Sequence, residues 1–251
     1  MNTNKMTRVK SLMKLDFYRL FHTPAFYIML VIAAIIPAML ATMTDVDATG
    51  TAAPSIEITN AWQLVESTGG SAAAASPLDF GGYANINMVF IFAGLLMAIF
   101  VAHDYSSGFM KNIFTVHAKK MDYVVSKSAA GIFGGACMIL TYVIGTVIAG
   151  LIAGASFEAS VGGLIACLLS KVLLMGIFCS LFLAISVLFK SRLWLTIVFT
   201  FLFGMMLYPA ASVVTLDSNV LTILMALVAG AAGVVAIGAV STLFLKKRDL
   251  A

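Results

Sequence analysis

Charged residues are scarce in this sequence. They make up 10% of its 251 residues, against about a quarter in soluble domains, and 61% of the residues are hydrophobic. The mean hydropathy is +1.04. So few charges cannot cover a water-facing surface, which excludes a soluble globular protein. The net charge of +4 does not indicate nucleic-acid binding either, because the basic residues lie at the ends of long apolar blocks. Lipid is therefore the expected solvent for most of the chain.

Common chemical motifs are absent as well. The three cysteines, Cys137, Cys167 and Cys179, fall inside apolar blocks, which excludes a disulfide framework in the loops and a CxxC metal site. The sequence contains no G-x-x-x-x-G-K-[ST], H-E-x-x-H or G-x-S-x-G pattern. Its apolar blocks also lack the carboxylates on which proton-coupled and sodium-coupled transporters rely. We therefore expect no catalytic residue, no metal site and no cofactor bound by this chain.

Six apolar stretches are long enough to cross a bilayer. A helix needs about 20 residues to cross roughly 30 Å of hydrocarbon. The predicted spans are Pro24–Met43, Tyr83–Ala102, Lys127–Ala153, Val161–Phe189, Leu193–Ala211 and Val220–Leu245. The sequence thus predicts an all-α, polytopic transmembrane helical bundle that forms a single domain over residues 1–251.

The basic residues set the predicted orientation. Lysine and arginine precede the first span, occupy the second and fourth connections, and follow the last span; the alternate connections are acidic. Basic connections stay in the cytoplasm. We therefore expect a multi-pass protein of the cell membrane with both termini cytoplasmic, an extracellular loop at residues 44–81 and a cytoplasmic loop at residues 103–127. The carboxylates of the outer loop either attract cationic substrates or simply reflect the lack of basic residues there.

One ionisable residue interrupts the fourth apolar block. Lys171 lies about ten positions into Val161–Phe189, a block too long for one perpendicular span. We expect Ser160–Ser170 to lie partly along the outer interface and the span to begin near Lys171. The Lys171 ammonium would then extend outward to the interface. The alternative is an ionic contact in a substrate path.

Residues 4–22 have an amphipathic pattern ahead of the first span. Apolar residues recur there at spacings of three and four, with basic residues mostly on the other side. Such a helix lies in the cytoplasmic headgroup layer, where each basic residue gains about 1 kcal/mol from anionic lipid. It serves either as a topology anchor or as an elbow helix that also contacts a cytosolic partner.

The cytoplasmic loop contains a second amphipathic segment. Phe109, Met110, Ile113 and Phe114 share one face at helical spacing. An apolar face at a water-exposed turn has to be buried, either by the lipid interface or by another protein. Asp104, just past the second span, is expected to cap its helix or to pair with a neighbouring base.

Four segments together carry a family resemblance. They are the basic amphipathic lead Lys14–Leu20, the Thr23–Phe26 start of the first span, the stretch Asp104–Phe114, and the ending Phe244–Leu250. With the large outer loop between the first two spans, they resemble the membrane subunit of an ABC-2 type exporter. Asp104–Phe114 is similar to the family's acidic-x-x-x-Gly-x-x-basic-Asn stretch, and the resemblance covers essentially the whole chain.

The resemblance implies a permease that moves its substrate outward with a separate ABC ATPase. It implies two ATPase subunits, which hold ATP and Mg, and a second permease subunit in a homodimer or heterodimer. The residues it assigns to the coupling helix and ATPase docking are Asp104, Gly108, Phe109, Met110, Lys111, Asn112, Ile113 and Phe114. The residues it assigns to the elbow helix are Lys14, Asp16, Phe17 and Arg19.

The substrate class follows from the resemblance alone. Small members without a fused ATPase resemble bacterial antibiotic-peptide or lantibiotic immunity and export permeases. A peptide, an antibiotic or another amphipathic compound is therefore the expected substrate, and a cationic peptide would suit the acidic outer loop. Two alternatives stay open: a channel or secondary carrier that works without ATP, and a membrane scaffold that transports nothing.

Overall fold

The structure is a computed structural model and consists mainly of helices. It describes residues 3–42, 44–46, 52–54, 60–66, 86–115, 119–189, 192–206 and 218–246. The long helices after the N-terminal one are α2 (Pro24–Thr42), α5 (Ile86–Ser106), α7 (Lys120–Ala153), α8 (Val161–Phe189), α9 (Leu193–Met206) and α11 (Val220–Lys246). Each corresponds to one predicted span. The predicted span residues 43, 83–85 and 207–211 lie outside the described residues.

The number of membrane-capable helices is smaller than the number of predicted spans. Among the described residues, α5, α7, α8 and α11 are long and apolar enough to cross a membrane, and the bent pair α1–α2 adds a fifth candidate. Helix α9 is apolar but short over its described part. The structure therefore supports a membrane-spanning helical bundle with four or five such helices in the described ranges, and the six spans stay a prediction.

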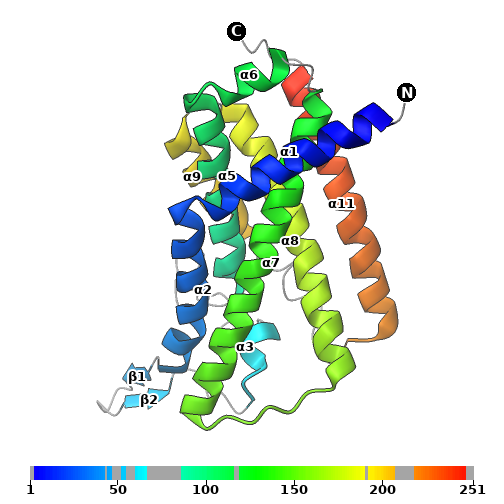
Figure 1. Cartoon of the computed structure of the whole chain (residues 1–251). Coiled ribbons are helices and arrows are strands. Elements are labelled where there is room, and N and C mark those ends of the chain that lie inside the picture. Colours follow the sequence, from blue (N-terminus) through cyan, green and yellow to red (C-terminus); the bar gives the residue numbers. More distant parts are fainter. Residues whose placement is uncertain are drawn as a thin grey trace.

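Helix α1 (Thr3–Phe21) crosses the bundle instead of running along it. It bends by 64° from α2 at the short break before Pro24. Figure 1 shows α1 lying across α7, while the start of α1, the end of α11 and the short helix α6 (Phe109–Thr115) all lie at the same end of the bundle. We refer to this end as the termini end.

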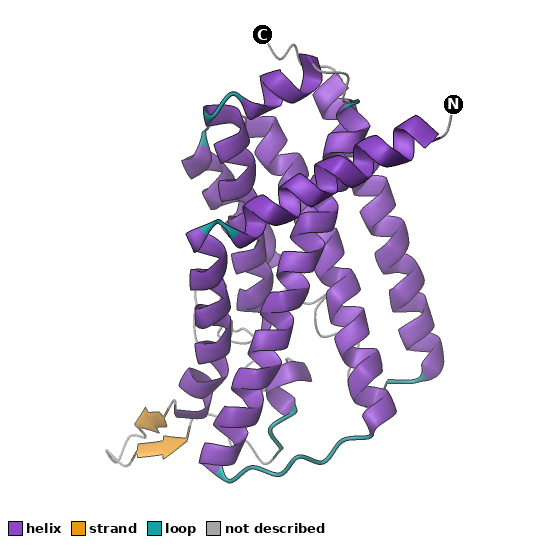
Figure 2. Ribbon diagram, viewed as in Figure 1, coloured by secondary structure: helices purple, strands orange, loops and turns teal. Residues whose placement is uncertain are grey.

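The opposite end carries short elements and connections. Strands β1 (Thr44–Val46) and β2 (Ala52–Pro54) form an antiparallel hairpin, and α3 (Gln63–Glu66) follows (Figure 2). The α3 segment is held against the bundle because the Tyr142 hydroxyl of α7 donates a hydrogen bond to the Leu64 carbonyl oxygen at 2.8 Å. The α7–α8 connection also lies at this end (Figure 2).

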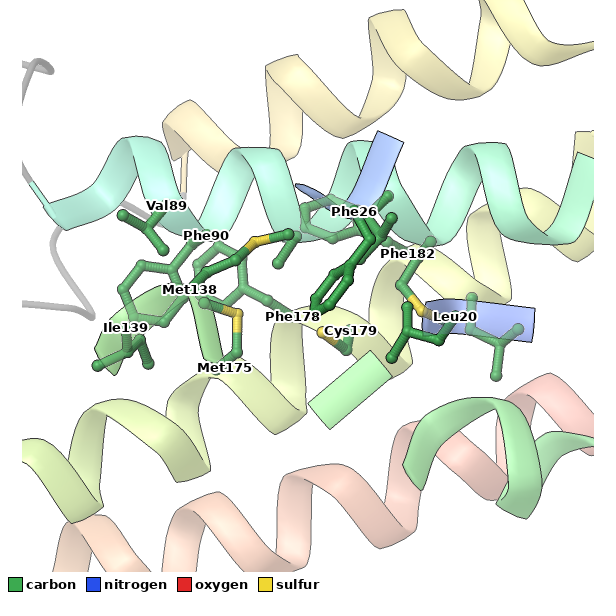
Figure 3. Packing of buried hydrophobic residues seen from close by; sticks show 14 of the residues in the cluster. Leu20, Phe26, Val89, Phe90, Met138, Ile139, Met175, Phe178, Cys179 and Phe182 are labelled. Carbon is green, nitrogen blue, oxygen red and sulfur yellow. The ribbon is translucent and has the colours of Figure 1, made fainter. Parts of the chain in front are cut away.

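Helix α7 is central to the packing, since it contacts α1, α2, α5, α8 and α11. Phe90 of α5 packs on Phe178 of α8 with ring centroids 5.0 Å apart, and Met138 and Met175 lie in the same cluster (Figure 3). Helix α2 approaches α7 at Gly145, where a Cβ would overlap the Ala34 carbonyl oxygen. Close helix contacts of this kind depend on small residues.

Helix α8 bears on two expectations about Lys171 and corrects one of them. The helix is continuous from Val161 to Phe189, and the Ser160 hydroxyl accepts a hydrogen bond from the Gly163 N–H at 3.1 Å, as an N-cap does. At 29 residues it is about 43 Å long, which exceeds the hydrocarbon thickness without any break. Ser160–Ser170 therefore leads into α8 without a break, and its position along the outer interface stays a prediction. Lys171 does not extend outward, because it is only 2% exposed and faces the interior of the bundle.

Candidate functional site

Four charged residues from three helices meet at the termini end. Lys127 of α7 places its Nζ 2.7 Å from Asp16 Oδ1 of α1 and 2.7 Å from Asp104 Oδ2 of α5. Arg19 of α1 places its Nη1 2.6 Å from Asp104 Oδ1. The side chains of Lys127 and Asp104 are fully buried, and that of Asp16 is 3% exposed. We call Asp16, Arg19, Asp104 and Lys127 the charge cluster.

Hydroxyl groups complete the hydrogen bonding of the charge cluster. Ser126 Oγ donates to Asp16 Oδ2 at 2.5 Å, and the Tyr123 hydroxyl donates to Asp104 Oδ2 at 2.8 Å. Every carboxylate oxygen of the cluster thus has a cationic or hydroxyl partner. Two positive and two negative charges also cancel. Buried ion pairs are tolerated when hydrogen bonds satisfy their polar atoms. Asp16 and Asp104 Oδ2 meet this condition, whereas Asp104 Oδ1 and Arg19 Nη1 form an ion pair at 2.6 Å without hydrogen-bond geometry.

Local helix geometry explains why these side chains converge. Asp16 and Arg19 are three residues apart and therefore share one face of α1. Tyr123, Ser126 and Lys127 stand at positions i, i+3 and i+4 of α7, which puts them on one face as well. A carboxylate near a helix C-terminus, such as Asp104, opposes the helix dipole, so it depends on the adjacent cations.

Helix α6 joins the charge cluster through an aromatic ring. The Arg19 guanidinium carbon lies 4.3 Å from the centroid of the Phe109 ring, within cation–π range. Gly108 makes the turn between α5 and α6 with φ of +70°, a left-handed conformation that favours glycine. Lys127 Nζ lies 3.6 Å from the centroid of the Phe100 ring. Aromatic faces thus cover the cations.

The apolar face of α6 is partly covered by this chain itself. Met110 is 2% exposed, and Phe114 packs edge-on against Tyr123 with ring centroids 5.8 Å apart. The periodicity grouped these residues correctly, and contacts with α5 and α7 cover part of the face. Phe109, Ile113 and Phe114 stay half-buried, so its burial by lipid or another protein stays a prediction. Lys111 and Asn112 lie on the exposed side.

The comparisons with known proteins place the chain in a family. A family model for an ABC-2 family transporter protein matches residues 12–207. The chain belongs to the ABC-2 transporter family. No curated protein and no solved structure matches it. The family match therefore confirms the resemblance that the motifs predicted: the chain is a permease, a transporter membrane subunit and an integral membrane protein. The matched range includes the whole charge cluster.

The predicted site residues of the permease do not all lie in one place. Asp104, Asp16, Arg19 and Phe109 come together in one place, although the sequence assigned them to two separate segments. Lys14 is exposed on α1, and Phe17 packs instead against Phe133 of α7 with ring centroids 5.0 Å apart.

Lys171 belongs to neither segment. Gly131 of α7 lies beside Cys179 of the antiparallel α8. This register sets Lys171 about 18 Å from Lys127 along the bundle. Lys171 therefore lies apart from the charge cluster and takes no part in it.

Lys127 is the member of the charge cluster that sequence reasoning missed. The sequence placed it only among the basic residues of the cytoplasmic loop, at the start of an apolar block. A usable signal was present, because the described acidic residues of this end, Asp16, Asp104 and Asp122, each adjoin apolar residues within an otherwise basic region. Buried carboxylates need cations, and Lys127 is the lysine that continues into the apolar block.

In the described ranges, no group of three potential metal ligands could hold a metal ion.

Proposed function

We propose that the permease is the membrane-spanning subunit of an ATP-driven exporter, and that the charge cluster transmits the movement of α6 to the bundle. The observation that supports this function is the contact of α6 with the cluster. Phe109 stacks on Arg19, Arg19 pairs with Asp104, and Asp104 shares Lys127 with Asp16. A displacement of α6 therefore acts on α1, α5 and α7 together.

The proposed assembly follows that of an ABC exporter. Helix α6 is the coupling helix, α1 is the elbow helix, and two ABC ATPase subunits bind ATP and Mg below the membrane. A second permease subunit, identical or different, completes the transport path. The ATPase subunits draw together when they bind ATP, and this movement displaces α6. A cluster of buried ion pairs suits such coupling, because packed interfaces shift between discrete arrangements and do not deform continuously.

We place the termini end in the cytoplasm of a cell membrane, because the basic connections lie there. Transport is then directed outward, and the expected substrate is a peptide, an antibiotic or another amphipathic compound. In the described part of the opposite end, Glu158 is exposed and the chain has no Lys or Arg. Such a surface suits a cationic substrate.

The decisive experiment separates binding of the ATPase from coupling. Tagged permease is expressed with its genomic neighbours, purified in detergent with any ATPase that stays bound, and reconstituted for ATP hydrolysis and transport. Phe109→Leu removes the ring on Arg19 but keeps an apolar side chain. A cation–π contact contributes about 0.5–2 kcal/mol, so we expect stimulation of ATP hydrolysis to fall by about twofold to thirtyfold while the ATPase still co-purifies.

Lys14→Gln is the matched control, since Lys14 lies exposed on the same helix as Arg19 but outside the charge cluster. It should leave stimulation unchanged. Full stimulation in Phe109→Leu would refute the coupling role of the cluster. Transport that persists in vesicles without ATP would instead support a secondary carrier, and binding without any transport would support a scaffold.

A further inference from the structure

A short piece of the connection between α2 and α5 is buried at the end of the bundle opposite the termini end. We call residues 60–66, which include α3, the plug segment. Its apolar side chains Ala61, Leu64 and Val65 are 0%, 4% and 0% exposed. Leu64 and Val65 belong to the same buried cluster as Tyr142 of α7. Connections between helices usually run over the surface, whereas the plug segment enters the core and closes it at this end.

Two hydrogen bonds tie the plug segment to the α7–α8 connection. Asn60 Nδ2 donates to the Glu158 carbonyl oxygen at 2.6 Å, and the Ala61 N–H donates to the Ser156 carbonyl oxygen at 2.9 Å. Asn60 Oδ1 also accepts from the Trp62 N–H at 3.1 Å, so this side chain both shapes the turn into α3 and fastens it. A segment held by individual hydrogen bonds, and not by a long helix interface, opens locally before the bundle unfolds.

The plug segment covers one end of the seam between α7 and α8. Gly135 of α7 lies against Met175 of the antiparallel α8. Tyr142, which holds α3, stands seven residues after Gly135 and shares its face of α7. Lys171 stands four residues before Met175 and shares its face of α8. This register sets Lys171 about 4–5 Å from the level of Tyr142, toward the termini end. The buried Lys171 thus lies about one helical turn behind the residue that holds the plug segment.

We propose that the plug segment is a gate: it seals the seam between α7 and α8 when closed, and it moves away during transport to connect Lys171 with the aqueous phase at this end. The proposal rests on the proposed function and adds the element that closes its transport path. A lysine inside a membrane-spanning helix is costly and marks a polar route or site. A permanent plug would be expected to cover an apolar core, whereas this segment covers a charged residue.

Cys167 can report whether the gate is open. It stands four residues before Lys171 on the same face of α8 and is 0% exposed. A permease with Cys137→Ala and Cys179→Ala keeps Cys167 as its only cysteine. This protein is placed in phosphatidylcholine nanodiscs, where both ends of the bundle meet water. The rate at which a charged, water-soluble maleimide labels Cys167 then measures how often the plug segment opens.

Two variants loosen the plug segment, and a third is their control. Tyr142→Phe removes the donor to the buried Leu64 carbonyl oxygen and should raise the labelling rate about five- to 150-fold. Asn60→Asp keeps the acceptor oxygen but loses the donor to the Glu158 carbonyl oxygen, and should raise the rate about two- to tenfold. Thr146→Val also removes a buried hydroxyl from α7, but this hydroxyl donates to the Tyr142 carbonyl oxygen within the same helix, so the rate should stay unchanged.

The ATPase supplies a second comparison. In nanodiscs that hold the permease with its bound ATPase, ATP and Mg should raise the labelling rate of Cys167 by about tenfold or more, because the open state becomes a larger share of the molecules. A permease with Cys179 as its only cysteine is the control. Cys179 lies about 18 Å further along α8, toward the termini end, and should label equally slowly with and without ATP.

Equal labelling of Cys167 in the unaltered permease, Tyr142→Phe and Asn60→Asp would overturn the gate. ATP hydrolysis that leaves the labelling of Cys167 unchanged would overturn it too, and both results leave the proposed function intact. Labelling of Cys167 and Cys179 that rises together would show a general loosening of the bundle and would also overturn the gate. If no ATPase stays bound to the unaltered permease, the proposed function itself fails, and the comparison of the variants still decides whether the plug segment seals the seam.

Discussion

Replacing Lys127 with methionine tests whether the charge cluster stabilises the permease. The Lys127 ammonium lies 2.7 Å from a carboxylate oxygen of Asp16 and 2.7 Å from one of Asp104, and the side chain is fully buried. Methionine keeps a similar length and removes the charge. The cluster then holds two carboxylates and only one cation, Arg19, and Asp16 keeps only the hydroxyl of Ser126 as a partner.

The magnitude follows from the cost of an unpaired buried charge. Removing one partner of a buried ion pair typically costs about 3–5 kcal/mol, against a total stability of about 5–15 kcal/mol for a folded domain. Adding Asp16→Asn restores neutrality, since Arg19 and Asp104 remain as a balanced pair. The double variant should therefore be more stable than the sum of the single effects predicts, with a coupling energy of about 1–3 kcal/mol. Lys14→Met, on the exposed side of the same helix as Asp16, should change stability by less than about 0.5 kcal/mol.

The assay is the free energy of unfolding of the purified permease in mixed detergent micelles, followed by circular dichroism as the denaturing detergent increases. The unaltered permease and all of these variants are compared under one lipid and salt condition. Effects of Lys127→Met and Asp16→Asn that simply add would show that the two side chains do not interact. A loss below about 0.5 kcal/mol for Lys127→Met would refute the reasoning that the cluster is buried and mutually compensated.

Three further predictions use other contacts of the described residues. Gly145→Ala should destabilise the permease by about 1–3 kcal/mol because the new methyl group meets the α2 backbone, while Gly238→Ala, where a Cβ has open space, should be neutral or slightly stabilising by thermal denaturation in detergent. Tyr142→Phe leaves the buried Leu64 carbonyl oxygen of α3 without its hydrogen-bond donor, so the free energy of unfolding should fall by about 1–3 kcal/mol. The melting temperature should fall accordingly, and protease cleavage near α3 should accelerate. In separate variants, a membrane-impermeant maleimide should label Glu158→Cys in intact cells and Lys111→Cys only after the cells are lysed. Labelling of both cysteines in intact cells would contradict the proposed orientation.

The helices along the bundle could be predicted from the sequence because lipid permits few alternatives. A segment in hydrocarbon has to satisfy its own backbone hydrogen bonds, so a long apolar run becomes a helix wherever it packs. The predicted Val161–Phe189 has the same bounds as α8. Helix α7 begins at Lys120, seven residues before the predicted span, because its polar first turns continue the helix beyond the apolar block that hydropathy detects.

The amphipathic segments could be predicted as helices, but not what covers them. Periodicity correctly grouped Met110 with Phe114 on one face of α6. Which surface buries that face depends on how far α5 and α7 extend past the membrane-capable core, and no local pattern records this. The same limit explains the error at Lys171, because a lysine inside an apolar run reads as an interfacial residue until the packing of α8 is known.

The charge cluster was decided by the tertiary structure alone. The sequence shows Asp16, Asp104 and Lys127 as isolated charges, and 111 residues separate Lys127 from Asp16. They meet because α1 lies across α7 before the 64° bend into α2 and because α5 packs beside α7. Composition and hydropathy thus determined that this chain lies in a membrane as helices, since those properties act residue by residue. The pairing of its buried charges depends on distances between helices, which only the folded bundle sets.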